Sequence, residues 1–305
     1  MPLLHLSRPA MGSIFEIFAF GDDEESLNCR LAVTLDFVEL LESQLSVYLP
    51  DSEISLINAA ACRQPVQTAA NLFSLLLRLR EWSEKTEGAF DPTAGKLIRE
   101  WGFYRRGHSH GKLFEAPSQQ RIEAIATGIG WGNIELNERD RSIRFLSPEI
   151  ELNLGAVGKG YVVQCAAERL RELGVSAALL HSGHSSIVAM DAPEDSNGWK
   201  VGFSSRSGEQ QKTTLLKNRS LSISDSGEQT TSIGGETFGH ILYPRTGFPV
   251  KRDLMIAVEA NDAAEADALS TAFLINGKQW TETFCENNPG IEAHFFESRR
   301  ESASL

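Results

Sequence analysis

A glycine-rich turn between two apolar segments constrains the fold more than any other feature of the chain. Residues 150–154 are apolar at alternate positions, 155–160 read Gly-Ala-Val-Gly-Lys-Gly, and an amphipathic run and the apolar stretch 175–183 follow. This order predicts strand, turn, helix and strand. The turn either contacts a phosphate, because a helix N-terminus presents unpaired N–H groups and Lys159 adds a charge, or is a structural tight turn. Asn153 stands where a Walker loop needs its first glycine, which excludes that motif.

The remaining strand and helix signals complete an α+β pattern. Helical periodicity is found in 22–49, 52–58, 71–86, 119–128 and 262–275, and strand-like alternation in 13–20, 133–138, 142–146, 199–203, 221–224 and 255–259. No internal repeat or low-complexity linker interrupts these segments. The sequence therefore predicts one domain over residues 1–305, with mixed, largely antiparallel sheets packed with helices and a seam only near Ser118.

Composition limits the classes of function. The chain is 41% hydrophobic and 23% charged, as in an ordinary globular protein, and its net charge of -12 argues against nucleic acid as a partner. The four cysteines form no CxxC pair, which favours reduced thiols over a disulfide framework or a zinc site. We find no signal peptide, lipidation cysteine or membrane span, so we expect a cytoplasmic protein without a membrane partner.

Residues 240–247 combine groups that suit phosphate chemistry. His240 can exchange a proton near neutral pH, and Arg245 offers a planar fork of donors for phosphate or carboxylate. Pro244 and Gly247 predict a tight turn between them. The alternative is a polar loop that merely joins two strands.

Asp267 and Thr271 are four residues apart, so they share one face of the predicted helix over 262–275. Alanines surround them on that face, where a solvated helix would carry Lys or Glu. A carboxylate with a hydroxyl suits a hard cation such as Mg2+, whose shell substrate phosphates complete. The alternative is an exposed carboxylate beside a threonine that fills the core.

Two pairs of histidines are spaced closely enough to consider a metal. His181 and His184 follow a buried strand and either bind a transition metal or line the rim of a pocket. His108 and His110 lie in a polar stretch without a nearby carboxylate or cysteine, so we interpret that stretch as an exposed loop.

Seven segments, taken in order, resemble the family of FAD:protein FMN transferases, the ApbE-type flavin transferases. They are 8–13, 52–58, 88–93 with 101–103, 155–161, 226–227, 240–247 and 266–272. The resemblance implies an ApbE-like flavin transferase fold and a Mg2+-dependent reaction. In that reaction the FMN part of FAD passes to a Ser or Thr hydroxyl of an acceptor flavoprotein, and AMP is released.

The resemblance also implies roles for individual residues. Three groups would bind the metal: Asp267, Thr271 and the backbone carbonyl of Gly158. Four residues would contact FAD: Met11, Lys159, Ser226 and Tyr243. At the catalytic site, His240 would accept the proton of the incoming hydroxyl, and Arg245 would order the loop or the phosphates.

Three positions depart from the family pattern by lacking its carboxylate: Asn153, Ser185 and Tyr243. Fewer carboxylates predict weaker cation binding, and a tyrosine cannot replace a carboxylate that orients a histidine. Two alternatives to the transferase are therefore open. One is a degenerate homologue that binds FAD or another nucleotide without transferring it, and the other is a hydrolase that splits FAD into FMN and AMP.

Overall fold

The computed structural model describes residues 2–104, 116–192, 196–205, 208, 210–227, 230–233, 236–251 and 254–297. The chain forms two compact units. Unit 1 comprises Met1–Val38, Lys159–Ser226 and Arg252–Leu305, and unit 2 comprises Glu39–Gly158 and Gly227–Lys251. These boundaries lie far from Ser118, so the predicted seam there is wrong. The single domain over residues 1–305 stays a prediction.

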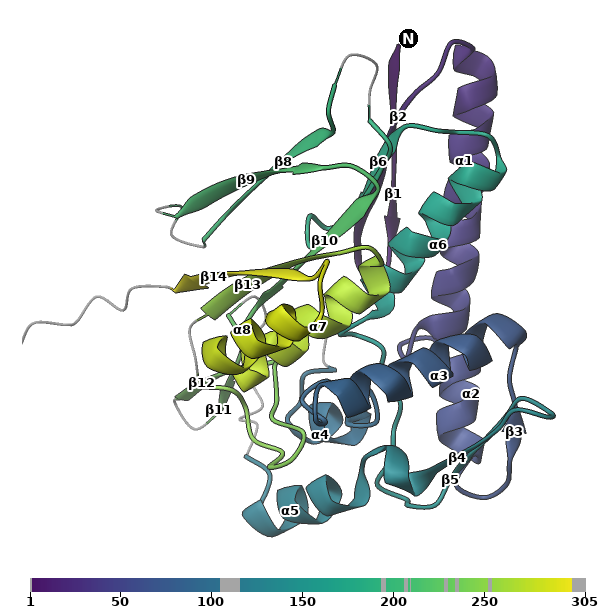
Figure 1. Cartoon of the computed structure of the whole chain (residues 1–305). Helices are drawn as coiled ribbons and strands as arrows, with labels where there is room; N and C mark the ends of the chain where they lie inside the picture. The colour runs from purple at the N-terminus through teal and green to yellow at the C-terminus, as the bar shows by residue number, and fades with distance from the viewer. Residues whose placement is uncertain are drawn as a thin grey trace, which may run out of the picture. The chain divides into compact units, whose positions relative to one another are not determined.

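Unit 1 is organised around a seven-stranded sheet whose neighbouring strands are all antiparallel (Figure 1). Its strands, in spatial order, are β1 (Leu3–Ala10), β2 (Ser13–Phe20), β6 (Ala178–Ser182), β7 (Ser186–Met190), β10 (Arg219–Asp225), β13 (Leu254–Ala260) and β14 (Glu292–Glu297). The other elements are a two-stranded ribbon, β8 (Trp199–Ser204) with β9 (Gln211–Leu216), and the helices α1 (Glu24–Leu45, which continues into unit 2), α6 (Gly158–Glu172), α7 (Ala263–Asn276) and α8 (Lys278–Asn287).

The register of the sheet separates two faces. Phe15 on β2 stands opposite Ser182, and the row continues through Ser186 to Ser222, on the face that α7 covers. Glu16 and Phe18 alternate with this row and lie on the opposite face. There the ribbon packs through an apolar cluster that includes Trp199, Phe203, Ile187 and Leu221.

Unit 2 combines short helices with small sheets. Its elements are α2 (Glu53–Ala60), β3 (Val66–Gln67), α3 (Ala70–Lys85), α4 (Gly95–Glu100), α5 (Gln119–Gly128), a 3-10 turn (Trp131–Asn133), β4 (Ile134–Asn137), β5 (Ser142–Phe145), β11 (Thr230–Ile233) and β12 (Glu236–Gly239). Ser52 caps α2, as predicted, by accepting the N–H of Ser55 at 3.1 Å. A buried cluster around Leu97, Trp101 and Ile122 includes Leu242 from the second segment of the unit.

The predicted α+β class with antiparallel sheets is confirmed, and the four cysteines, all in described positions, are free. The strand predicted over 150–154 is wrong, because its one bridge joins Glu151 to Ala94. Asn58 gives the physical reason: its amide donates to the carbonyl of Leu152 (2.9 Å) and accepts the N–H of the same residue (2.7 Å). A side chain thus replaces a neighbouring strand. Strands β1 and β14 and helix α8 were not predicted.

Candidate functional site

The carboxylate of Asp267 lies inside unit 1, on the helix-covered face of the sheet. Asp262 caps α7 by accepting the N–H of Glu265, and Asp267 follows in the second turn. Only 5% of Asp267 is exposed. Its Oδ2 accepts the N–H of Gly160 (2.9 Å), and its Oδ1 accepts the hydroxyl of Ser222 (3.0 Å). The alternative that Asp267 is an exposed carboxylate is therefore wrong.

Gly160 brings α6 against α7. A Cβ at this position would lie 2.2 Å from the carbonyl oxygen of Ala263 and 2.7 Å from the Cβ of Asp267. The two helices can therefore meet only at a residue without a side chain. Gly160 is in the first turn of α6, where N–H groups have no partner within the helix, so Asp267 satisfies one of them and places negative charge at the positive helix end.

The electrostatics of Asp267 follow from its burial. Removal from water raises the pKa of this carboxyl, while Lys159, the Gly160 N–H and the hydroxyls of Ser222 and Ser186 lower it. The charged form thus depends on a few fixed donors and on one lysine. An added cation would favour that form further, because opposite charge compensates for burial.

Hydroxyl groups surround the next turn of α7. Ser224 Oγ lies 2.7 Å from Ser270 Oγ and 3.3 Å from Thr271 Oγ1. A carboxylate with hydroxyl oxygens is a donor set that hard cations prefer, so Asp267 and Thr271 fit the Mg2+ that the resemblance implies. Gly158, the first residue of α6, ends the other unit, and its carbonyl as a third ligand stays a prediction.

Lys159 contacts Ser185, one of the three positions at which this chain lacks the carboxylate of the family pattern. Its Nζ contacts the hydroxyl of Ser185, which lies in the β6–β7 turn and also donates to the carbonyl of Ser182 at 3.3 Å. Lys159 also acts on the charge of Asp267, so unit 1 brings together Asp267, Thr271, Lys159 and Ser185.

The two remaining residues of unit 1 that are predicted to contact FAD, Met11 and Ser226, have clear structural roles. Met11 and Gly12, with φ of 54 and 70, form the two-residue turn between β1 and β2. Ser226 is buried, and its Oγ accepts the N–H of Leu254 at 3.0 Å, next to the end of β10. Their contacts with FAD stay predictions.

The tight turn predicted in unit 2 is confirmed. The carbonyl of Tyr243 accepts the N–H groups of Thr246 (3.2 Å) and Gly247 (2.7 Å), and the N–H of Tyr243 donates to Phe248 (2.8 Å). Gly247 has a φ of 75, which an L side chain rarely adopts. His240 comes just before this turn and Arg245 is exposed on it. These contacts use the backbone of Tyr243, so a change of its side chain leaves them in place.

Trp101 holds the turn from the interior of unit 2. Its Nε1 donates to the carbonyl of Gly247 at 2.7 Å, and only 3% of the residue is exposed. Its ring lies 5.5 Å from that of Phe238 and 6.0 Å from that of Phe248. The motif at 101–103 therefore supports the segment that carries His240 and Arg245.

Replacing Trp101 with phenylalanine should lower the free energy of unfolding by about 1–3 kcal/mol, because a buried carbonyl loses its donor. Thermal unfolding of wild type and variant measures this loss. Trp131→Phe is the matched control, since the buried Nε1 of Trp131 has no hydrogen-bond partner and its removal breaks no bond. Equal losses in both variants would contradict the role of the Gly247 contact.

Asn153 belongs to a polar network of unit 2. Its Oδ1 accepts the N–H of Gly155 (2.7 Å), and its Nδ2 donates to the hydroxyl of Tyr104 (2.8 Å). Tyr104 in turn donates to Glu151 (2.9 Å), which is paired with Arg99 at 2.6 Å. Burial is the largest cause of the raised pKa of Tyr104, so its hydroxyl keeps its proton. An aspartate at 153 could accept from Gly155 but could not donate to Tyr104.

Asp91 was not predicted as a site residue, although it lies within the segment 88–93. Both the N–H (2.9 Å) and the hydroxyl (2.7 Å) of Thr93 donate to its Oδ1. Burial raises the pKa of Asp91 from 3.8 to about 6, while the contacts from Thr93 lower it. An Asp-Pro-Thr sequence within a run of small and aromatic residues was the only signal in the sequence.

Asp91→Asn should make the protein more stable than wild type at pH 7.5. The folded state raises the pKa of Asp91, so this group stabilises the fold below pH 3.8, and the contribution is lost as the pH rises through about 6. Asparagine keeps both contacts from Thr93 and carries no charge. We expect a gain of up to about 3 kcal/mol at pH 7.5, reduced by solvent screening, and a smaller gain at pH 4.5. Urea unfolding of wild type and variant at both pH values measures this gain. A gain that is the same at pH 4.5 and pH 7.5 would contradict the raised pKa.

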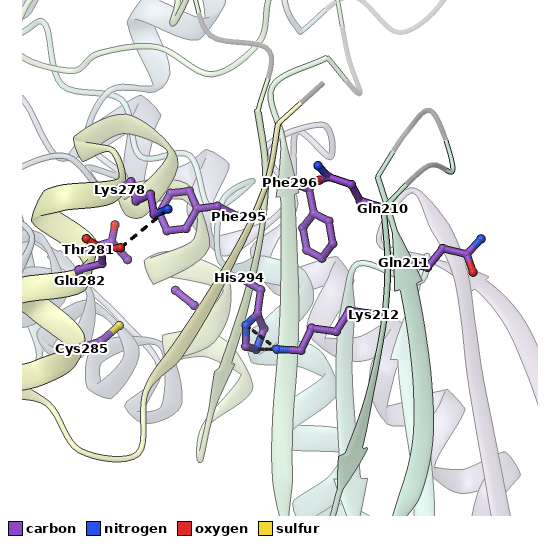
Figure 2. Close-up of a pocket in the computed structure, with 11 residues that line it drawn as sticks. Gln210, Gln211, Lys212, Lys278, Thr281, Glu282, Cys285, His294, Phe295 and Phe296 are labelled. Atoms are coloured by element: carbon purple, nitrogen blue, oxygen red, sulfur yellow. Dashed lines mark hydrogen bonds and ion pairs between the residues drawn. The ribbon is translucent and has the colours of Figure 1, made fainter. Parts of the chain in front are cut away.

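Unit 1 also has a hollow of about 560 Å³ whose lining contains none of the predicted site residues (Figure 2). Residues of β9, α8 and β14 line it. Lys212 Nζ lies 2.7 Å from Nδ1 of His294, whose Nε2 lies 3.3 Å from Glu259. These contacts engage the Lys212 and His294 side chains with neighbouring groups of the protein.

Comparison with known proteins gives the family. The model of the ApbE family matches residues 11–295. The chain belongs to the ApbE family. Two curated ApbE relatives carry the name FAD:protein FMN transferase. The one from Vibrio cholerae is 25% identical over 283 residues, 90% of this chain and 82% of the relative. The one from Treponema pallidum is 28% identical over 298 residues, 91% of this chain and 80% of the relative.

Solved ApbE structures confirm the fold. The ApbE protein of Thermotoga maritima has a TM-score of 0.86 at 23% identity, with 98% of this chain and 97% of that chain covered. The flavinyl transferase ApbE of Pseudomonas stutzeri, in its apo form, has a TM-score of 0.82 at 24% identity, with 98% and 92% covered. The ApbE-like fold implied by the resemblance is therefore confirmed. In the described part of this ApbE chain, no helix has both the length and the apolar character needed to cross a membrane.

Proposed function

We propose that this chain is a Mg2+-dependent FAD:protein FMN transferase that moves FMN from FAD to a Ser or Thr hydroxyl of an acceptor flavoprotein and releases AMP. The buried carboxylate of Asp267 among hydroxyl groups is the observation that carries this function, because it is a donor set for a hard cation. The curated relatives named FAD:protein FMN transferase support the reaction. We place it in the cytoplasm, without nucleic acid or membrane as a partner.

Residues of unit 1 would bind the cation and a phosphate oxygen of FAD. Asp267 and Thr271, with the carbonyl of Gly158, would hold the cation. Bound Mg2+ would neutralise the negative charge of the pyrophosphate, which lowers the barrier to phosphoryl transfer. Lys159 would bind a phosphate oxygen, and the contact with Ser185 keeps its ammonium group in one place.

Unit 2 would move the proton. His240 would accept the proton of the acceptor hydroxyl, whose oxygen forms a bond to the phosphorus of the FMN part. The bond from that phosphorus to the bridging pyrophosphate oxygen breaks, and AMP leaves with its electron pair. Arg245, on the turn that Trp101 supports, would order the loop or the phosphates. Tyr243, together with Met11 and Ser226 of unit 1, would contact FAD.

The structure gives one reason to consider a second function, a homologue that binds FAD without transferring it. Asn153 carries no charge, and hydrogen bonds to Gly155 and Tyr104 occupy its amide. Ser185 is likewise neutral and is engaged with Lys159. Restoring aspartate at Tyr243 should then recover transfer, because that carboxylate could orient His240.

One incubation separates the candidates. The protein is mixed with FAD, Mg2+ and an acceptor domain that carries a threonine flavinylation site, and FAD, FMN, AMP and acceptor-bound flavin are quantified by chromatography. A transferase gives AMP and acceptor-bound flavin in equal amounts, and EDTA stops both. FAD that stays intact but co-elutes with the protein indicates a binding homologue. Free FMN with AMP indicates a hydrolase, in which water replaces the acceptor hydroxyl.

A further inference from the structure

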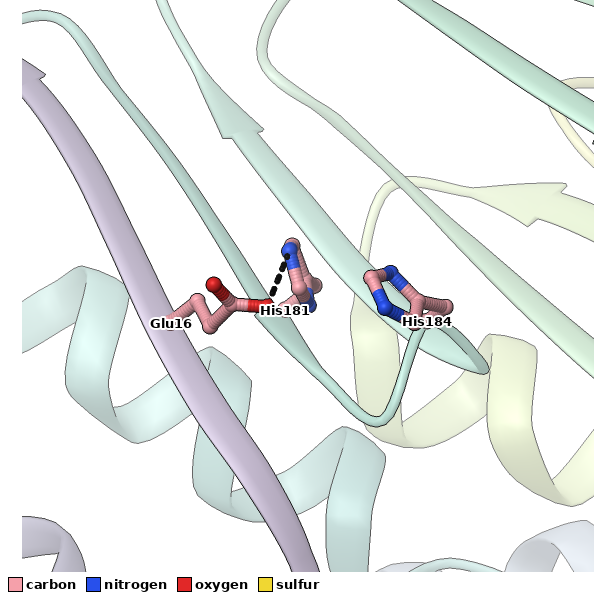
Figure 3. A group of neighbouring side chains, drawn as sticks. All are labelled: Glu16, His181 and His184. Atoms are coloured by element: carbon pink, nitrogen blue, oxygen red, sulfur yellow. Dashed lines mark ion pairs between the residues drawn. The ribbon is translucent and has the colours of Figure 1, made fainter. Parts of the chain in front are cut away.

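A second group of side chains that can act as metal ligands lies in unit 1, on the face of the sheet opposite to Asp267. Glu16 on β2 stands directly across from His181 on β6, and His184 is in the turn that follows β6. The three side chains lie next to one another (Figure 3). One potential ligand atom from each lies within 4.8 Å of those of the other two. Residues far apart in sequence thus form one compact donor set.

The distances suit a tetrahedral ion. His181 Nε2 lies 3.4 Å from Glu16 Oε2. Two ligands bound at about 2.1 Å in tetrahedral geometry are about 3.4 Å apart, so these atoms already have the required spacing. The ring centroids of His181 and His184 are 4.6 Å apart. His184 is exposed, so a side-chain rotation can bring its nitrogen to the same point.

His181 lacks a partner that a buried imidazole needs. Only 7% of the residue is exposed, and its Nδ1 is buried without a hydrogen-bond partner. Buried polar atoms are nearly always paired, so the contacts of this chain do not satisfy the His181 ring, whose other nitrogen, Nε2, faces the carboxylate of Glu16.

A further residue orients the carboxylate. His5 Nε2 lies 2.8 Å from Glu16 Oε1, and the His5 ring stacks on Phe18 at 4.2 Å with an interplanar angle of 4°. This contact uses one oxygen of Glu16 and leaves the other towards His181. Metal-binding side chains are commonly fixed in this way by a second layer of hydrogen bonds.

We propose that Glu16, His181 and His184 bind a divalent transition-metal ion of the Zn2+ type. Two imidazoles and one carboxylate suit such an ion and leave a fourth position for water, whereas Mg2+ prefers an all-oxygen shell. The site lies on the opposite face of the sheet from Asp267 and is not part of the site for the FMN transfer proposed above. It would also fix the β6–β7 turn, in which Ser185 follows His184 and contacts Lys159.

The test is metal binding to the full chain, stripped of metal and kept in excess Mg2+ so that oxygen sites are saturated. Co2+ is added first, because its visible absorption reports a site with nitrogen ligands, and Zn2+ then displaces it. We expect one Co2+ per chain, displaced by one Zn2+. His184→Ala should weaken Zn2+ binding by at least about 10-fold, and so should Glu16→Gln, which keeps the size of the side chain.

Two control variants give the test its specificity. His294→Ala removes a histidine that pairs with a carboxylate, Glu259, but belongs to no cluster of three metal ligands among the described residues, so Zn2+ binding should not change. The double variant His108→Ala and His110→Ala, outside the described residues, should also bind Zn2+ as the wild type does. Unchanged binding in both His184→Ala and Glu16→Gln would overturn the proposal. Loss of Zn2+ binding in either folded control variant would overturn it as well. Circular dichroism of the metal-free variants shows whether they are folded.

Discussion

Replacing Asp267 with asparagine should slow FMN transfer from FAD by about 100-fold to 1,000-fold in a protein that remains folded. Asparagine has the shape of aspartate: its oxygen can accept the Gly160 N–H, and its amide can donate to the Ser222 hydroxyl. The variant therefore loses little except the negative charge. A hard cation depends on that charge, so the metal dependence of the reaction should be lost with it.

Rates of AMP release and acceptor labelling, measured over a range of Mg2+ concentrations, test this expectation. Glu259→Gln is the matched control, because it neutralises another buried carboxylate of unit 1 that pairs with His294. The control should keep the Mg2+ dependence of the wild type. If Asp267→Asn reacts at the wild-type rate with the same Mg2+ dependence, Asp267 is not a metal ligand.

Gly160→Ala should strongly destabilise the protein, lowering the free energy of unfolding by about 3 kcal/mol or more. The added methyl group would lie 2.2 Å from the backbone oxygen of Ala263, and backbone cannot rotate away as a flexible side chain can. α6 and α7 would have to separate, and the N–H of Gly160 would then lose its contact with Asp267. Activity should fall together with stability.

Urea unfolding measures the effect on stability. Gly202→Ala on β8 is the matched control, because the nearest atom to its added Cβ, Thr213 Oγ1, is 4.0 Å away. We expect that control to change the free energy of unfolding by no more than about 0.5 kcal/mol. A Gly160→Ala protein as stable as the control would show that α6 and α7 are not in close contact.

Much of the fold follows from local signals. The periodicity of 71–86 predicted α3, the alternation of 13–20 predicted β2, and Ser52 marked the start of α2. The prediction was wrong where contacts between residues distant in sequence decide the structure. Residues 150–154 alternate like a strand, but the amide of Asn58 takes the place of the neighbouring strand, and no local pattern shows that.

The candidate site also has features that local sequence patterns reveal and features that depend on long-range contacts. The helical spacing of Asp267 and Thr271 was visible in the sequence, but the burial of Asp267 depends on Gly160, which is 107 residues away. His181 and His184 were visible as a pair. Glu16 was not visible as their partner, because only the register of β2 against β6 brings it to them. Spacing reveals ligands on one element, whereas ligands shared between strands need the pairing itself.

The division of the chain into interleaved segments affects how the protein can form during synthesis. Gly247, whose carbonyl accepts the ring N–H of Trp101, is 146 residues further along the chain. Unit 2 is therefore incomplete until the ribosome has translated Gly247. In unit 1, one edge of β13 likewise has no pairing partner until β14 has been translated. A growing chain therefore carries unpaired strand edges and uncovered apolar side chains for most of its translation, and such surfaces promote aggregation. Slow or interrupted translation of this protein should make it depend on chaperones.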